Sequence, residues 1–235
     1  MLGRTAVLIA TGVAALLAIG GLVSSASQQD RLPPAADFGD PIDNRFFPLE
    51  PGTVLRYSGQ ENGTPAEGKL VVTHRTKMIL GIRAVVVRDS LWLDGKPEER
   101  TTDWYAQDRQ GNVWYLGEDS FNNVNGKWKR NKGSWLSGVD GARPGIIMEA
   151  YPHVGDSYQQ EDYPGHAEDH AQVLSTDASV SVPFGDFDHA LKTKEWTPLE
   201  PGVTEHKFYA AGIGEVRSII VQGIPEEMKL VSVTS

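Results

Sequence analysis

Apolar and polar positions alternate in short runs along most of this chain, and turn residues separate the runs. In the first half, residues 69–75, 82–93, 99–107 and 113–116 are rich in β-branched and aromatic side chains. Leu80-Gly81 and Asp94-Gly95 separate the first three runs, and Asp-Gly between two such runs is a strong hairpin signal. We therefore predict an antiparallel meander of four or five strands in this half.

The second half returns to the same alternation after a polar interruption. Residues 118–145 are rich in Asn, Gly and Lys, which predicts a long loop with a small hairpin at Asn125-Gly126. Residues 144–150 fit a single helical turn, and no helical period extends over ten or more residues. Strand-like runs then follow at 156–182, 187–196, 204–210, 214–221 and 228–234.

A sheet of about ten strands has to pair, cover or close its edges. The predicted fold class is therefore all-β and mainly antiparallel, as a strongly curved sheet or an incomplete barrel with one long central loop.

The N-terminal segment has the three parts of a bacterial secretory signal. Arg4 is the only charged residue before Asp30, and residues 6–23 form an apolar run of 18 residues. The small residues Ser24 and Ala26 then favour cleavage after Ala26. The alternative is an uncleaved anchor, because the run is at the short end of what spans a bilayer.

These features divide the chain into a signal peptide (1–26), a polar, proline-rich linker (27–43) and a single β-rich domain (44–235). We expect a secreted or extracytoplasmic protein. It would touch a membrane only through the N-terminal segment, and only if that segment is not cleaved.

Composition narrows the range of partners. The net charge of −9 becomes −10 once Arg4 is removed with the signal, which argues against binding to nucleic acid or to anionic lipid. The chain has no cysteine, so disulfides, thiolate zinc sites and a lipid-modified cysteine are excluded for this sequence. The domain has to be held together by an ordinary hydrophobic core.

Several segments carry a resemblance to known proteins. Residues 46–53 (FFPLEPGT), 103–108 (DWYAQD), 111–119 (GNVWYLGED) and 138–145 (GVDGARPG) resemble a widespread family of uncharacterised secreted bacterial β-rich proteins. Residues 182–187 (VPFGDF) and 208–214 (FYAAGIG) are similar to periplasmic lipoprotein carriers with curved sheets, although the helices that plug such carriers are not evident here. The resemblance implies export and a curved sheet, and it implies no established activity.

A histidine- and acid-rich segment is the sharpest candidate for chemistry. Residues 161–170 hold two histidines and four carboxylates, and His166, Glu168, Asp169 and His170 are the predicted metal ligands. In a strand, His166, Glu168 and His170 point to the same side. Imidazole with carboxylate suits Zn, Cu, Mn or Fe. The alternative interpretation is a solvated acidic hairpin.

A set of tryptophans around the predicted loop is the second candidate. Trp104, Trp114 and Trp135, together with Asp140 and Arg143, are predicted to bind a ligand at the mouth of the curved sheet. The alternative is that these aromatic residues belong to the core, with about half of them buried by the alternation of a strand.

Three functions remain open from the sequence. The first is an exported, non-catalytic binding protein that holds a small or apolar ligand on its curved sheet. The second is a metal-binding protein or metal-dependent hydrolase centred on His166, Glu168 and His170. The third is an envelope structural or interaction module without a pocket. No GxSxG motif for a serine nucleophile is present. Asp103 and Glu118 could act as a carboxylate pair in glycoside hydrolysis, but their spacing in the sequence does not show the distance between them. The one cofactor expected is a divalent metal.

Overall fold

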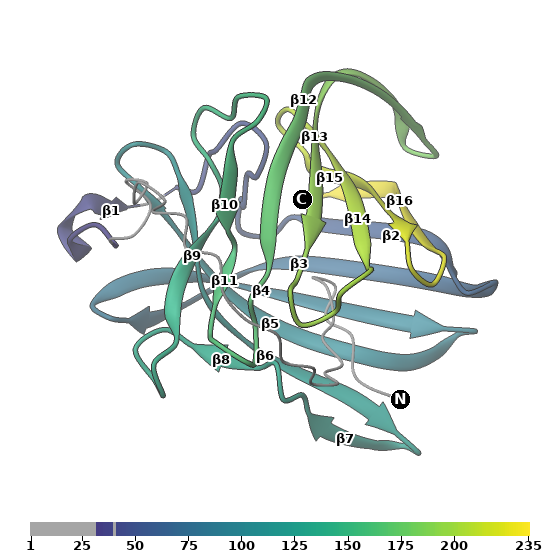
Figure 1. Cartoon of the computed structure of the whole chain (residues 1–235), viewed down its shortest axis with the longest axis horizontal. Helices are drawn as coiled ribbons and strands as arrows, with labels where there is room; N and C mark the ends of the chain where they lie inside the picture. Colours follow the sequence, from purple (N-terminus) through teal and green to yellow (C-terminus); the bar gives the residue numbers. More distant parts are fainter. Residues whose placement is uncertain (1–31, 40) are drawn as a thin grey trace, which may run out of the picture.

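Antiparallel strands make up almost all of the structure (Figure 1). The computed structural model describes residues 32–39 and 41–235, so the predicted signal peptide lies outside the described residues. The strands are β1 (Phe38–Gly39), β2 (Val54–Glu61), β3 (Thr64–Ile79), β4 (Ile82–Leu93), β5 (Lys96–Asp108), β6 (Val113–Val124), β7 (Lys127–Arg130), β8 (Trp135–Leu136), β9 (Arg143–Met148), β10 (Ser157–Gln159), β11 (Glu161–Asp162), β12 (His170–Val182), β13 (Gly185–Trp196), β14 (Thr204–Ala210), β15 (Gly214–Gln222) and β16 (Glu226–Thr234). One short 3-10 helix, η2 (Ala35–Asp37), precedes β1. No helix among these residues is long and apolar enough to cross a bilayer.

Two-residue turns set the register of the long hairpins. Asp94 and Gly95, which join β4 to β5, both have positive φ angles, of 49° and 69°. This backbone matches the twist of the flanking strands, and glycine or a short polar residue adopts it most easily. The turns at Leu80-Gly81 and Asn125-Gly126 have the same form, so the predicted hairpins are confirmed.

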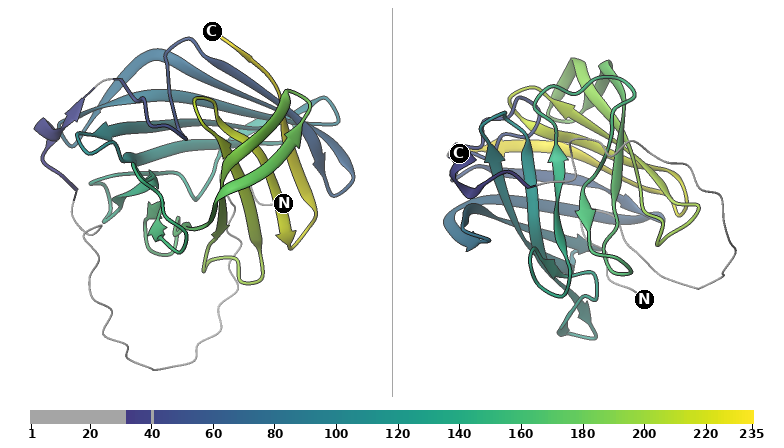
Figure 2. Two further views of the ribbon diagram at one scale, coloured as in Figure 1. Left: turned by 90° about the horizontal axis from the view of Figure 1, so that it is seen from above. Right: turned by 60° about the vertical axis from the view of Figure 1, so that its left-hand side comes forward.

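The sheet curls into a nearly closed barrel (Figure 2). Its order is β10-β12-β13-β14-β15-β16-β2-β3-β4-β5-β6-β9-β11, with β1 paired to β5, and β7 and β8 paired to β6. The path begins at β10 and ends at β11, and the single residue Gln160 separates these two strands in the chain. The predicted fold class, an all-β curved sheet or incomplete barrel, is confirmed.

Gly145 of β9 marks the seam where the barrel stays unsealed. A Cβ atom at this position would lie 2.2 Å from the carbonyl oxygen of Gln160 and 2.6 Å from that of Gln159. Only a residue without a side chain allows the two backbones to approach so closely.

We predict that Gly145→Ala lowers the free energy of unfolding by about 1–3 kcal/mol, because the backbones on either side of the seam have to move apart. Urea unfolding measures the effect. Gly185→Ala is the matched control, since no atom lies within 4 Å of a Cβ built there. Equal stability of the two variants would show that the seam is not tightly packed.

The N-terminal part of the described chain lies on the domain. Phe38 and Gly39 pair with Asp108 and Gln107 at the C-terminal end of β5, and the Phe38 ring meets the Trp114 ring edge-on, with the ring centroids 6.3 Å apart. Ile42 is buried in the core. Phe38 and Ile42 therefore pack against the barrel, and the division of the chain into signal peptide (1–26), linker (27–43) and domain (44–235) stays a prediction.

The polar stretch 118–145 is shorter as a loop than predicted. β6 continues to Val124 and pairs with β7 and β8, so only short connections remain irregular. The single helical turn considered at residues 144–150 is not formed. Ile146 pairs instead with Trp114 of β6, and Pro144 pairs with Glu161 of β11.

Candidate functional site

A cavity that is partly open to solvent lies between two walls of the barrel. Its volume is about 140 Å³. A cavity of about 150 Å³ holds benzene, so this one has room for a ring or a short alkyl chain. Strands β2 to β5 form one wall and β14 to β16 form the other. The segment Phe47–Leu49, Ile147 of β9 and the loop residues Glu200, Val203 and Ile213 complete the lining.

The lining follows the two-residue period of the strands. Most strands contribute alternate residues, whose side chains therefore point to the same face, whereas β15 begins with the adjacent lining residues Gly214 and Glu215. The residues are Leu55 and Tyr57 (β2), Gly68 and Leu70 (β3), Asp89 and Leu91 (β4), Thr101, Asp103 and Tyr105 (β5), Glu205, Lys207 and Tyr209 (β14), Ser218 and Ile220 (β15), and Glu226 and Met228 (β16). The cavity is thus mostly apolar, with charged groups projecting from several of its strands.

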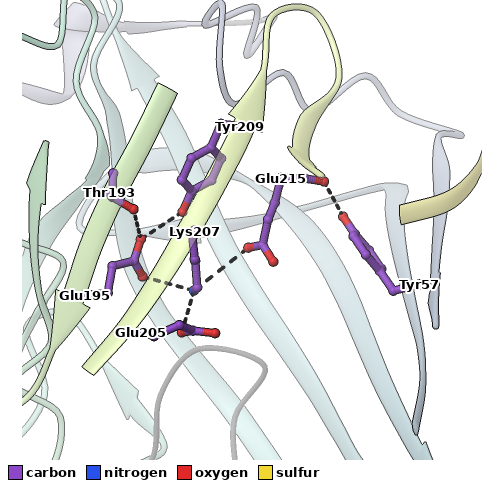
Figure 3. Close-up of polar contacts among 7 residues, drawn as sticks. All are labelled: Tyr57, Thr193, Glu195, Glu205, Lys207, Tyr209 and Glu215. Carbon is purple, nitrogen blue, oxygen red and sulfur yellow. Dashed lines mark hydrogen bonds and ion pairs between the residues drawn. The ribbon is translucent and has the colours of Figure 1, made fainter. Parts of the chain in front are cut away.

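Lys207 is the centre of the charged part of the cavity wall (Figure 3). Its side chain is 3% exposed, and its Nζ lies 3.0 Å from Glu195 Oε2, 3.8 Å from Glu205 Oε2 and 3.9 Å from Glu215 Oε2. Burial alone would lower the pKa of Lys207, but the three carboxylates outweigh it and raise that pKa well above its usual value. Lys207 therefore stays positively charged.

Hydroxyl groups hold the same network in place (Figure 3). Tyr209 Oη and Thr193 Oγ1 donate hydrogen bonds of 3.0 and 2.9 Å to Glu195 Oε1. Tyr57 Oη donates to the backbone carbonyl of Glu215 at 3.0 Å. These bonds orient Glu195 toward Lys207 and tie β2 to the start of β15.

Carboxyl groups of the cavity wall have raised pKa values. Burial raises the pKa of Glu205 to about 8, although Lys207 opposes the shift. Burial also raises the pKa of Asp103 to about 7 and that of Asp89 well above its usual range. Glu205 and Asp103 therefore release their protons near neutral pH rather than near pH 4.

A second acidic network lies behind the cavity wall. Tyr115 Oη is 2.7 Å from Asp103 Oδ1 and 3.0 Å from Glu118 Oε2. A phenol has one proton to donate, so a protonated carboxyl has to supply the other hydrogen bond. Burial, together with the charges of Glu161 and Asp103, raises the pKa of Glu118 well above its usual value. Asp103 lines the cavity, whereas Glu118 does not.

The three predicted ligand-binding tryptophans are buried in the core and do not line this cavity. Trp114 Nε1 donates to Asp108 Oδ2 at 2.8 Å, and Trp135 Nε1 donates to Glu161 Oε1 at 3.2 Å. The ammonium of Lys77 lies 3.3 Å from the centre of the Trp104 ring.

Both members of the pair Trp104 and Tyr105 are buried, where alternation predicted one inside and one outside. The Lys77 side chain covers the outward-facing ring.

Asp140 and Arg143 lie at the surface, away from the cavity. Asp140 occupies an exposed turn with a positive φ of 51°. The guanidinium of Arg143 pairs with the carboxylate of Asp162, with Nε 2.6 Å from Oδ2. The structure therefore does not bring the five predicted ligand-binding residues together, and a ligand site formed by them stays a prediction.

The four predicted metal ligands occupy different surroundings. The exposed His166 ring stacks on the Tyr163 ring, with the ring centroids 4.3 Å apart. The His170 ring stacks on the Trp196 ring, with the centroids 5.5 Å apart. Glu168 accepts a hydrogen bond from the backbone N–H of Gly165. Asp169 is buried, and burial raises its pKa.

Within residues 32–39 and 41–235, no group of three or more His, Asp or Glu side chains is arranged to hold a metal ion. Metal binding at His166, Glu168, Asp169 and His170 stays a prediction.

The charged cavity residues were not identified as a site from the sequence. The signal that could have found them is the segment 204–210 (TEHKFYA), in which Glu205, Lys207 and Tyr209 alternate with other residues. Charged residues on one face of a strand usually indicate the solvent side. Here that face is the interior, because the opposite wall of the barrel covers it.

Comparisons with known proteins give a similarity of fold. No model of a known protein family matches the chain, and no curated protein matches it in sequence. A protein from Bacteroides fragilis, described as exported and as having a YmcC-like fold, is 15% identical with a TM-score of 0.48, covering 82% of this chain and 100% of that one. A protein from Parabacteroides distasonis described as a lipoprotein is 14% identical with a TM-score of 0.47, covering 81% and 99%.

Proposed function

We propose that this protein is an extracytoplasmic, non-catalytic binding protein that holds a small, largely apolar ligand inside its barrel. The observation that carries the proposal is the cavity of about 140 Å³ between β2–β5 and β14–β16. Ligand sites are typically concave, mostly apolar, and supplied with a few polar groups that orient the ligand. The signal-like segment 1–26 supports a location outside the cytoplasm.

The lining residues favour a binding site over a structural module with a filled interior. Leu70, Leu91 and Ile220 are only partly buried although they face the inside of the barrel. Apolar side chains around an open space gain free energy when an apolar ligand fills it.

Filling the cavity tests the proposal. We expect Leu91→Trp to reduce the binding of hexan-1-ol, a probe matched to the cavity volume, by about tenfold or more, since it removes the space that the alkyl chain needs. Saturation-transfer NMR and a chemical-shift titration measure the binding.

The control is Leu80→Trp, which makes the same change on an exposed turn outside the lining. If the unaltered protein does not bind hexan-1-ol, or if both variants bind it equally, the cavity is not the site and the structural-module hypothesis gains support.

A further inference from the structure

We propose that the ligand of this cavity carries a positive charge: a small amphipathic amine or quaternary ammonium whose head lies against the carboxylates and whose tail lies against the leucines and isoleucines. This inference rests on the proposed function, since it names the class of ligand for the same cavity.

The charge balance of the wall supports the proposal. The described residues that line the cavity include four acidic side chains from its two walls, which are Asp89, Asp103, Glu205 and Glu215. Among the same lining residues, Lys207 carries the one positive charge. Acidic groups thus outnumber cations on the cavity wall. Burial raises the pKa values of several of them, so they hold protons before any ligand enters and can ionise when a cation arrives.

Lys207 is already saturated with negative partners. Glu195, Glu205 and Glu215 all lie within 4 Å of its ammonium, and Glu195 makes the shortest of these contacts at 3.0 Å. An anionic head group would have to displace one of these carboxylates and would face the others at close range. Like charges brought together in a buried site are strongly unfavourable.

Asp89 faces the cavity from the opposite wall, on β4. Among the described residues no ion pair involves its carboxylate, and the backbone N–H of Ser90 is its hydrogen-bond donor. Its neighbours on the adjoining strands are Leu70 and Thr101, which offer no positive charge. Asp89 is half-buried, and the charge of Lys207 on the other wall only partly offsets the cost of its own charge. A carboxylate held away from bulk water is unfavourable unless it takes up a proton or a positive partner arrives.

The rest of the lining suits the remainder of such a ligand. Leu55, Leu70, Leu91, Ile147, Ile213, Ile220 and Met228 offer an apolar surface for an alkyl chain. The rings of Tyr57, Tyr105 and Tyr209 also line the cavity, and aromatic faces attract ammonium groups. The cationic head and the apolar tail of such a ligand would therefore each contact a complementary part of the cavity wall.

Three probes that differ only in the head group test the proposal: hexylamine, hexan-1-ol and hexanoate, titrated into the full domain at about pH 8 and followed by NMR. We expect hexylamine to bind about tenfold or more tightly than hexanoate, with hexan-1-ol between them. If hexanoate binds as tightly as hexylamine, the inference is wrong, because Lys207 would then be binding the carboxylate of the probe. Equal binding of hexylamine and hexan-1-ol would overturn it as well.

The pattern of probe binding distinguishes an error in the ligand class from an error in the proposed function. If none of the three probes binds, the cavity is not a ligand site, and both proposals fall. If hexan-1-ol binds but hexylamine has no advantage, the proposed function stands and the cationic ligand is wrong.

Two conservative variants test which carboxylates bind the ammonium group of hexylamine. Asp89→Asn and Glu215→Gln are each expected to weaken hexylamine binding about fivefold to tenfold while leaving hexan-1-ol binding unchanged. The matched control is Glu161→Gln, a buried carboxyl that bonds to Trp135 and does not line the cavity. Loss of hexylamine binding in the control alone would place the recognition elsewhere.

Discussion

Replacing Lys207 with methionine is expected to lower the free energy of unfolding by about 3–5 kcal/mol at pH 8, the range measured when one partner of a buried ion pair is removed. The ammonium of Lys207 lies within 4 Å of three carboxylates, and the side chain is 3% exposed. Methionine keeps much of the aliphatic volume of the side chain. The decrease in the free energy of unfolding therefore measures the removal of the charge rather than the creation of a void.

The pH dependence of this loss separates electrostatics from packing. Without Lys207, which lowers the pKa values of Glu205 and Glu215, these carboxyls would keep their protons to higher pH. At pH 5, Glu205 is protonated in the folded protein, since its pKa is about 8. Removing the cation then leaves fewer uncompensated negative charges, so the loss should be clearly smaller at pH 5 than at pH 8.

Urea unfolding of both proteins at the two pH values measures this difference, and unfolding at pH 5 remains informative if the variant is unstable at pH 8. Lys96→Met is the control, because the Lys96 side chain is 82% exposed and its ion pair with Asp94 lies at the surface. A loss that does not change with pH would indicate that Lys207 acts through packing.

The unaltered protein is expected to become less stable as pH rises from 6.5 to 8.5. Burial raises the pKa values of Glu99, Glu161 and Glu205 from 4.5 to about 8. In this pH range the folded state holds protons that the unfolded state has released. The stability that these carboxyls contribute is complete below pH 4.5 and is lost as pH rises through about 8.

The expected size is large for a pH change near neutrality. One pKa unit corresponds to about 1.4 kcal/mol, and the loss ends once the pH passes the folded pKa of about 8, so a single such carboxyl contributes about 2 kcal/mol over this range. For a domain of this size, that lowers Tm by roughly 4–8 °C.

Histidines do not obscure the result. Burial lowers the pKa values of His170 and His206 below 6.5, so their contribution has the opposite sign and is confined to lower pH. Calorimetry at several pH values provides the measurement. A Tm that stays constant or rises between pH 6.5 and 8.5 would mean that the buried carboxyls are ionised in the folded state. Glu161→Gln should flatten the slope, because it removes one of them.

Local sequence signals predicted the strands and turns well because their causes are local. The dipeptide Asp94-Gly95 favours positive φ angles regardless of what surrounds it, and β4 spans the predicted residues 82–93. The segment 144–150 was harder to predict, since its strand β9 forms only by pairing with β6 and β11.

The sequence by itself determined the all-β class, the main hairpins and the acidic, cysteine-free composition. It did not determine which face of each strand would lie inside the barrel. Alternation along β14 separates Glu205, Lys207 and Tyr209 from their neighbours, but only closure of the sheet turns that face inward. The physical reason is that Lys207 is stable in the interior only where β13, β14 and β15 bring Glu195, Glu205 and Glu215 around it, and these residues meet only in the folded sheet.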